Sequence, residues 1–362
     1  MSKGNVLLCA GGTGGHLFPA EAVAHEMIAR GYTVHLAADD RVRKFASTFP
    51  AEQIHEIRSA TLGSKNPISL IKTLIALFQG YRQSQKMLLE VQPVVAAGFG
   101  GYPTVPPLFA STRVGVPTLV HEANAVLGRA NRMLSQYVNK VAIGFGETTN
   151  VEGMVTVTGN AVRPNIITAS QTPYPDRKDD GSFNLLVFGG SQGAAFFSEC
   201  LPEACRLLGP DIASRLKIVQ QARPEDKDAV IAAYAEMGID AKVDSFFSEM
   251  HEHLANAHLV VSRAGASTVS ELAVVGRPSI LVPYPHALDH DQAKNAATVS
   301  AEGGATLFPQ SELTPQKLAD ELTAAIENPK KLALAAKNAK KTGRPDAAKA
   351  LADMLEAIAL KR

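Results

Sequence analysis

Cysteine is scarce in this sequence of 362 residues, and the cysteines that occur form no metal or redox motif. Cys9, Cys200 and Cys205 show no CxxC or CxxH spacing, and three is an odd number for a set of disulfides. This pattern is typical of a reducing compartment, in which thiols stay buried and unpaired. The sequence therefore excludes a small disulfide-stabilised protein and favours structural roles for all three cysteines.

The sequence also has no excess of charge and no long apolar segment. Lys and Arg number 36 against 35 Asp and Glu, so the basic excess that drives general nucleic-acid binding is missing. The most apolar long window, residues 68–78, is interrupted by Lys72 and is shorter than the roughly 20 residues that span a bilayer. The apolar run after Lys3 is too short for a signal peptide. We expect a cytoplasmic protein that binds no nucleic acid and meets a membrane only peripherally.

Short apolar runs alternate with helical stretches along the whole chain, which predicts parallel sheets joined by crossover helices. The predicted strands of the first half are residues 6–9, 33–37, 54–57, 94–97, 118–120, 141–143 and 156–157. Those of the second half are residues 184–188, 217–219, 242–243, 259–262, 279–282 and 305–308. The length suggests two domains. The predicted fold class is therefore α/β, with two Rossmann-like, doubly wound parallel sheets.

Each half opens with a similar sequence, VLLCAGGTGG at residues 6–15 and LLVFGGSQG at residues 185–193, which predicts a strand, a glycine-rich loop and a helix in both. We place the first domain at residues 1–162 and the second at residues 163–344. The polar stretch at residues 168–182 is the best linker candidate. A break at Gly343-Arg344-Pro345 predicts two C-terminal helices, and we expect the last one, residues 345–362, to rejoin the first domain.

Glycines between a strand and a helix let a bound anion approach the free N–H groups of the helix start. Two such loops predict two anionic ligands, or one ligand held between the domains; tight turns required by packing are the alternative. The first loop has Leu17 where a dinucleotide fingerprint needs its third glycine, although Asp39 could serve as the ribose-binding acid. No GxxxxGK[ST] occurs, which excludes a P-loop.

Six motifs, in order along nearly the whole chain, resemble the bacterial MurG glycosyltransferases. They are GGTGGH at residues 11–16, GFGGY at 98–102, HEAN at 121–124, GNAVR at 159–163, GGSQGA at 189–194 and RAGASTVSE at 263–271. The resemblance implies a GT-B architecture, with two domains facing a cleft. It also implies transfer of GlcNAc from UDP-GlcNAc to the C4 hydroxyl of MurNAc in lipid I, the undecaprenyl-pyrophosphoryl-MurNAc-pentapeptide. The product would be lipid II for peptidoglycan synthesis, formed at the cytoplasmic face of the inner membrane.

The same resemblance implies a donor site. Arg163 and Ser191 would contact the nucleotide and its diphosphate. Phe247 would lie beside the uracil, at a position where a smaller aliphatic residue is more usual. Glu271 would bind the ribose hydroxyls. The other donor-binding residues would be Asn124 and Gln292 at the sugar, Thr13, Gly14 and Gly15 from the first domain, and Ala266, Ser267, Thr268, Val269 and Ser270 at the nucleotide pocket. Ordinary helix capping is the alternative for the last group.

The implied reaction inverts the anomeric centre, so the acceptor hydroxyl needs a base. His16 at the helix entrance is the first candidate, because imidazole titrates near the working pH. A histidine that only bonds a phosphate or the loop backbone is the alternative. Glu122 and Asp39 are further candidates for the base, and His121 could orient its neighbours.

No required metal or other cofactor is expected. Asp289 and Asp291 form a DxD triplet of the kind that holds a divalent ion in many sugar-nucleotide transferases. Two helix N-termini and Arg163 can stabilise the leaving diphosphate without an ion.

Apolar residues recur at helical spacing around residues 68–78, and basic residues flank them. The stripe comprises Ile68, Ile71, Leu74, Ile75 and Phe78, widened by Leu70 and Leu77 and flanked by Lys65, Lys72, Arg82 and Lys86. Core packing is the common fate of such a stripe. A lipid-linked acceptor instead favours contact with an anionic membrane surface. We assign Ile71, Lys72, Ile75 and Phe78 to this contact, and the loop of Gly100, Gly101 and Tyr102 to the acceptor.

Two other functions stay open at this point. A UDP-GlcNAc 2-epimerase shares the architecture, but it would leave the apolar stripe and the loop at residues 98–102 without a role. A nicotinamide-dependent oxidoreductase is disfavoured by the missing third glycine.

Overall fold

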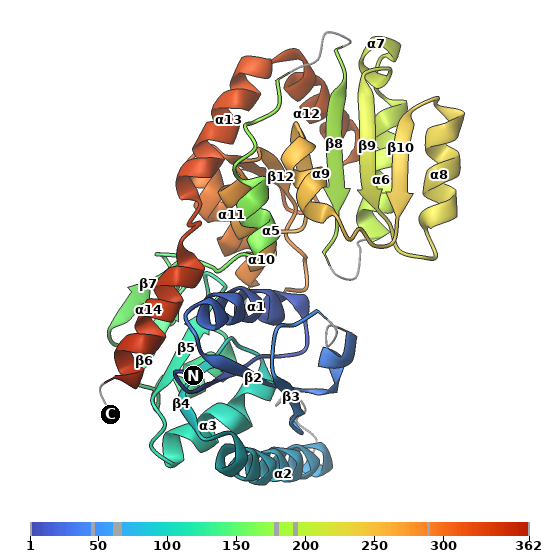
Figure 1. The fold of residues 1–362 in the computed structure, drawn as a ribbon. Coiled ribbons are helices and arrows are strands. Elements are labelled where there is room, and N and C mark those ends of the chain that lie inside the picture. Colours follow the sequence, from blue (N-terminus) through green and yellow to red (C-terminus); the bar gives the residue numbers. More distant parts are fainter. Residues whose placement is uncertain are drawn as a thin grey trace. The chain divides into compact units, whose positions relative to one another are not determined.

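The computed structural model describes residues 2–44, 48–60, 67–176, 181–190, 195–287 and 290–360. The chain divides into two units, each with its own parallel sheet (Figure 1). The first unit is Met1–Arg163 with Arg344–Arg362, and the second is Pro164–Gly343. The sequence-based boundaries at residues 162 and 344 each lie one residue from these divisions.

The sheet of the first unit has the order β3-β2-β1-β4-β5-β6-β7. Its strands are β1 (Asn5–Cys9), β2 (Thr33–Ala38), β3 (Gln53–Glu56), β4 (Pro93–Gly98), β5 (Thr118–Glu122), β6 (Lys140–Ile143) and β7 (Val155–Val157). Its helices are α1 (Gly14–Ala29), η1 (Asp40–Lys44), α2 (Pro67–Val91), η2 (Tyr102–Thr104), α3 (Val105–Arg113), α4 (Arg129–Leu134) and α14 (Ala347–Ala359). The chain changes direction of winding between β1 and β4, so the loops after these two strands meet at the edge where such sheets bind ligands.

The inner strands of the first sheet are buried on both faces, which is why they are apolar runs, whereas the edge strands β3 and β7 are largely exposed. In β1, Val6 and Leu8 pack in a core that includes residues of α1 and α14. Leu7 and Cys9 pack in a second core on the other face, with residues of α2 and α3. The three cysteines are buried and unpaired, which confirms their structural interpretation.

The C-terminal helix α14 belongs to the first unit. It packs on α1 and β4, with Leu351 and Leu355 in the core. At its surface, Arg30, the C-cap of α1, forms ion pairs with Asp353 at 2.8 Å and Glu356 at 2.6 Å. The helix is thereby held by both apolar packing and charge.

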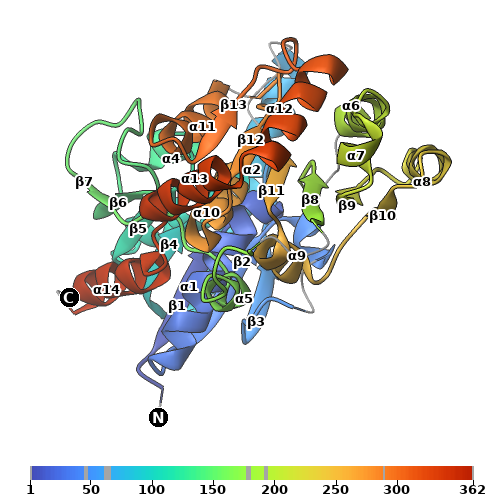
Figure 2. The same ribbon diagram turned by 90° about the horizontal axis from the view of Figure 1, so that it is seen from above.

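The sheet of the second unit has the order β10-β9-β8-β11-β12-β13. Its strands are β8 (Phe183–Phe188), β9 (Leu216–Gln221), β10 (Asp240–Asp244), β11 (Leu259–Ser262), β12 (Ser279–Leu281) and β13 (Ala305–Leu307). Its helices are α5 (Pro164–Ala169), α6 (Ala195–Arg206), α7 (Pro210–Ala213), α8 (Lys227–Glu236), α9 (Met250–Asn256), α10 (Ala266–Val275), α11 (Asp291–Ala301), α12 (Pro315–Glu327) and α13 (Pro329–Thr342). Figure 2 shows α10, α11 and α13, which pack against one another. Each predicted strand of both halves is confirmed.

The predicted linker at residues 168–182 was wrong for the part that the structure describes, because this stretch is bound into the second unit. The buried guanidinium of Arg277 donates to the carbonyl oxygens of Thr172 and Pro173, and also to those of Leu254 and Ala255. Burial lowers the pKa of Arg277 to about 10, so the side chain stays charged at neutral pH. Backbone carbonyl groups of this polar stretch thus serve a buried cation.

We expect Arg277→Met to destabilise the second unit by about 3 kcal/mol or more, because several buried carbonyl groups lose their donor. Arg206→Met is the matched control. Arg206 pairs only at the surface, with Glu203 and Glu236, and its loss should cost about 1 kcal/mol at most. Urea unfolding of the full chain measures both, and equal losses in the two variants would contradict the expectation.

Candidate functional site

Two glycine loops of the first unit lie against each other and enclose the His16 ring. The N–H of Gly11 donates to the carbonyl oxygen of Gly100 at 3.1 Å. Gly100 and Gly101 have φ values of +94° and +82°, a conformation that favours glycine. A Cβ atom at Gly11 would come within 2.9 Å of His16 Nδ1, and one at Gly101 within 3.2 Å of the same atom. Glycine is therefore required at these positions by the close approach of the imidazole.

His16 lies in the first turn of α1, with its ring only partly exposed. Its Nδ1 is 3.1 Å from Thr13 Oγ1, the side chain at the N-cap of the helix. Burial, assisted by Arg41 and opposed by Asp39, lowers the pKa of His16 to about 4. The imidazole is therefore neutral at physiological pH and able to accept a proton. Gly14 and Gly15 begin the same helix beside it, and a Cβ at Gly15 would meet only open space.

Asp39 supports the first glycine loop. Its Oδ1 accepts a hydrogen bond from the N–H of Gly12 at 3.1 Å, and its Oδ2 accepts one from Arg41 Nε at 2.8 Å. Both carboxylate oxygens are thus engaged by protein groups. This geometry favours a structural role for Asp39 over that of a base or a ribose ligand.

Glu122 is buried and holds the loop that follows β5. Its Oε1 accepts from the backbone N–H and Nδ2 of Asn124, at 2.9 and 3.1 Å. Its Oε2 accepts from the backbone N–H of Gly128 at 2.9 Å and from Asn131 Nδ2 at 2.8 Å. Burial, opposed by these donors, leaves the pKa of Glu122 above its ordinary value. The structure thus brings Glu122 and Asn124 together, with the carboxylate used to shape the loop.

Two further candidate site residues of the first unit, His121 and Arg163, lie at the end of β5 and just before α5. His121 Nε2 lies 3.1 Å from the carbonyl oxygen of Gly159, and burial lowers the pKa of His121 to about 4. The Arg163 guanidinium lies 4.1 Å from the centroid of the Phe18 ring, a cation–π contact with α1. This contact places Arg163 over the same helix that carries His16.

In the second unit, the motif at residues 263–271 forms the start of α10. Gly265 is the N-cap in an extended conformation and makes no side-chain cap. Ala266, Ser267 and Thr268 follow in the first turn, and Glu271 lies one turn further, 7% exposed. The buried Ser267 Oγ makes no hydrogen bond to any residue that the structure describes. The first turn therefore presents free backbone N–H groups, an arrangement that attracts anions.

Phe247 lies on the loop after β10, and Gln292 lies in the first turn of α11. Phe247 is buried, with the His253 ring at 5.0 Å in an edge-on contact. Gln292 Oε1 accepts from the N–H of Tyr284 at 2.9 Å, which fixes the loop before α11. Ser191 and Asp289 lie outside the described residues. Within the described ranges no group of three or more His, Cys, Asp or Glu side chains is suited to hold a metal.

Sequence reasoning gave Arg263 no role, although it opens the RAGASTVSE motif. Its buried guanidinium donates to the carbonyl oxygens of Val282 and Pro283, at 3.1 and 3.2 Å, and to Gln310 Oε1. It also lies 5.6 Å from the Tyr284 ring centroid. Arg263 therefore fixes the loops after β11, β12 and β13 relative to one another. Its position directly after an apolar strand and two residues before the glycine was the available signal.

The apolar stripe of α2 points to solvent. The exposed fractions are 57% for Ile71, 54% for Leu74, 51% for Ile75 and 63% for Phe78, and Lys72 is exposed beside them. The opposite side of α2 carries the buried Met87, Leu88 and Val91. Core packing, the alternative for this stripe, was therefore wrong for its members from Leu70 to Phe78. The side chains of Lys65 and Ile68 lie outside the described residues. Among the described helices none is long and apolar enough to cross a membrane.

Comparison with known proteins gives one consistent family. The model of the glycosyltransferase family 28 N-terminal domain matches residues 6–143, and that of the C-terminal domain matches residues 184–351. One curated relative, from Agrobacterium fabrum, is UDP-N-acetylglucosamine--N-acetylmuramyl-(pentapeptide) pyrophosphoryl-undecaprenol N-acetylglucosamine transferase. It is 54% identical over 99% of this chain and 96% of its own.

Two solved structures extend the comparison. MurG from Acinetobacter baumannii is 27% identical, with a TM-score of 0.80 over 98% of this chain and 99% of that one. UDP-GlcNAc 2-epimerase from Neisseria meningitidis is 15% identical, with a TM-score of 0.68 over 99% and 100%, which shows a shared fold alone. The fold is GT-B, as expected. The chain belongs to glycosyltransferase family 28 and, within it, to the MurG-type N-acetylglucosamine transferases.

Proposed function

We propose that this chain transfers GlcNAc from UDP-GlcNAc to the C4 hydroxyl of MurNAc in lipid I, which yields lipid II. The observation that carries the proposal is the 54% identity, over 99% of the chain, to a transferase named for these substrates. The epimerase alternative has support only from the shared fold, which many activities use. Movement of labelled GlcNAc from UDP-GlcNAc onto a lipid I analogue is the direct test.

His16 is the proposed base. As the bond between the sugar and UDP breaks, the acceptor hydroxyl must lose its proton, and a neutral imidazole can take it. We assign the tautomer in which Nδ1–H donates to Thr13 Oγ1, at 3.1 Å, so that Nε2 keeps its lone pair. Glu122 is the weaker candidate, because each of its oxygens already accepts two hydrogen bonds.

The second unit is the proposed donor domain. The first turn of α10 would face the diphosphate with free N–H groups, helped by the positive end of the helix dipole. Glu271 would accept hydrogen bonds from the ribose hydroxyls, and Phe247 would lie beside the uracil. Arg163 and Ser191 would contact the nucleotide, and Asn124 and Gln292 the sugar. This arrangement stabilises the leaving diphosphate without a divalent ion.

The first unit is the proposed acceptor domain. Gly100, Gly101 and Tyr102 lie in the loop beside His16, where a MurNAc hydroxyl would meet the base. The exposed stripe of α2, with Lys72 next to Ile71, Ile75 and Phe78, would rest on an anionic membrane surface. The protein would then act as a peripheral protein on the cytoplasmic face of the plasma membrane.

For His16→Ala we expect kcat to fall by about 10²–10⁴-fold with little change in UDP affinity. In the wild type, kcat should stay level at neutral pH and fall as pH drops through about 4, since a protonated ring cannot accept another proton. The variant should lack this acid limb. Steady-state kinetics against pH, corrected for the folded fraction, measure both effects.

Glu122→Gln is the comparison for this test. It should lose stability through its loop and keep the acid limb. An acid limb that survives in His16→Ala and disappears in Glu122→Gln would transfer the role of base to Glu122.

Glu271→Gln should raise the KM for UDP-GlcNAc about tenfold or more, because charge-assisted hydrogen bonds to the ribose are worth about 1.5–3 kcal/mol each at most. Its melting temperature should stay close to that of the wild type. Glu302→Gln, at an exposed position after α11, is the matched control and should leave KM unchanged. A donor KM that does not change in Glu271→Gln removes this residue from the nucleotide site.

Lys72→Glu combined with Ile75→Asp should weaken binding to anionic vesicles and spare turnover of a short-chain, water-soluble acceptor. It reverses one charge and interrupts an exposed apolar surface. Lys331→Glu with Leu334→Asp repeats these changes at the same spacing on α13, where Leu334 is 58% exposed. Vesicle sedimentation compares the two double variants, and equal binding by both would contradict the assignment of the α2 stripe to membrane contact.

A further inference from the structure

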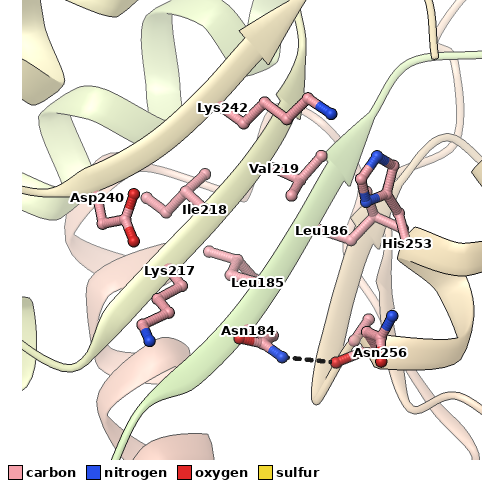
Figure 3. Close-up of a pocket in the computed structure, with 11 residues that line it drawn as sticks. Asn184, Leu185, Leu186, Lys217, Ile218, Val219, Asp240, Lys242, His253 and Asn256 are labelled. Atoms are coloured by element: carbon pink, nitrogen blue, oxygen red, sulfur yellow. Dashed lines mark hydrogen bonds between the residues drawn. The ribbon is translucent and has the colours of Figure 1, made fainter.

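A pocket of about 230 Å³ lies on one face of the second sheet. Leu186 of β8 and Val219 of β9 form its floor, and Lys217, Lys242 and His253 are among the polar residues around it (Figure 3). None of these residues has a role in the proposed transfer of GlcNAc. Its volume is below that of sites for drug-sized ligands, at about 300–1,000 Å³, and suits a molecule of one ring.

The pocket exists because this sheet is covered unequally. Parallel sheets normally carry helices on both faces. Leu185 and Ile218 point into the core formed with α6 and α8, and their neighbours Leu186 and Val219 point to the other face. Figure 1 shows α6 behind β9 and β10 and α8 beside β10, with no labelled helix in front of β9 and β10. Val219 is thus left partly exposed on this face, while Leu186 beside it is buried.

Lys242 and His253 lie together at one end of this surface (Figure 3). Asn184 donates to the carbonyl oxygen of Asn256, at 2.9 Å, at the other end. Lys242 forms no ion pair with any residue that the structure describes, although the carboxylates of Asp244 and Glu249 interact with its charge. The buried His253 Nε2 has no hydrogen-bond partner among the described residues. Asp240, the carboxylate of the pocket, is the register partner of Lys217 on the neighbouring strand β9. The end near Lys242 therefore offers an anion two hydrogen-bond donors.

We propose that this pocket binds a small carboxylate with a single apolar ring. The ring lies on Leu186 and Val219, and the carboxylate accepts hydrogen bonds from Lys242 Nζ and His253 Nε2. Hydrogen bonds with a charged partner are the stronger kind, and the apolar floor favours a ring over a hydrated inorganic anion.

A ligand in the pocket affects Phe247, because Lys242 and His253 line the pocket and also lie against the Phe247 ring. Lys242 Nζ lies 5.5 Å from the centroid of the Phe247 ring, and the His253 ring lies 5.0 Å from it. A carboxylate that draws these groups into the pocket withdraws them from Phe247. This step rests on the proposed function, in which Phe247 borders the uracil. Bound carboxylate then weakens UDP binding on the order of fivefold, and UDP weakens carboxylate binding by the same factor.

Benzoate is the probe, titrated calorimetrically into the full-length protein. Wild type should bind it saturably, and Lys242→Met should bind it at least about tenfold more weakly, since the charged partner is lost. Lys331→Met, which removes one lysine from an exposed position on α13, should bind like wild type. Neutral benzamide should also bind about tenfold more weakly. Absence of saturable binding to wild type, or equal binding by Lys242→Met and Lys331→Met, overturns the site.

The coupling is tested by UDP titrations with and without saturating benzoate, in wild type and in Phe247→Ala, which removes the ring and most of its apolar surface. The proposal expects benzoate to weaken UDP binding in wild type and to have no such effect in Phe247→Ala. If Phe247→Ala binds UDP normally, the uracil placement in the proposed function fails, whereas the benzoate site is judged by the lysine variants alone. If Phe247→Ala weakens UDP binding and benzoate does not, the coupling is overturned and the proposed function stands.

Discussion

The close approach of backbone to an imidazole ring is the constraint on which the candidate catalytic site depends. The loops after β1 and β4 meet because their strands are neighbours at the point where the winding of the sheet reverses. The loops joined by the hydrogen bond from Gly11 to Gly100 then lie so close to the His16 ring that Gly11 and Gly101 have no room for a side chain. The same enclosure removes water from the ring and keeps it neutral. The close approach of the two loops to His16 thus explains both the need for glycine and the lowered pKa of the imidazole.

Buried guanidinium groups serve a comparable purpose in the second unit. Arg277 donates to carbonyl oxygens at residues 172–173, 254–255 and 275–276, and Arg263 donates to those of Val282 and Pro283. Carbonyl groups at the ends of strands and helices have no partner in their own element, so a planar group with five donors can satisfy several at once. Arg277 therefore ties the C-terminal end of α10 to two other segments, and Arg263 ties the segment before α10 to the loop after β12.

The positions of the strands could be predicted from the sequence because apolar runs covered on both faces leave a strong local pattern. The carboxylates could not be assigned in the same way. Glu122 in HEAN looks like a base in the sequence, yet its four donors come from Asn124, Gly128 and Asn131, which only the folded loop brings together. Asp39 likewise has partners that depend on a turn at Gly12. The linker was misjudged because Thr172 and Pro173 supply backbone carbonyl oxygens to Arg277, which is distant in sequence, and composition does not reveal such a contact.

The similar sequences at residues 6–15 and 185–193 predict the same strand, loop and helix in both halves, but they do not predict the same chemistry. In the first unit the glycine loop encloses a histidine that can accept a proton. In the second unit, the described helix start with free N–H groups is that of α10, which follows a different strand, β11. A strand, a loop and a helix fix only where backbone groups converge, and the side chains around them decide between accepting a proton and binding an anion. Similar units can therefore supply the two halves of a transfer reaction, because each presents a different group at the same kind of sheet edge.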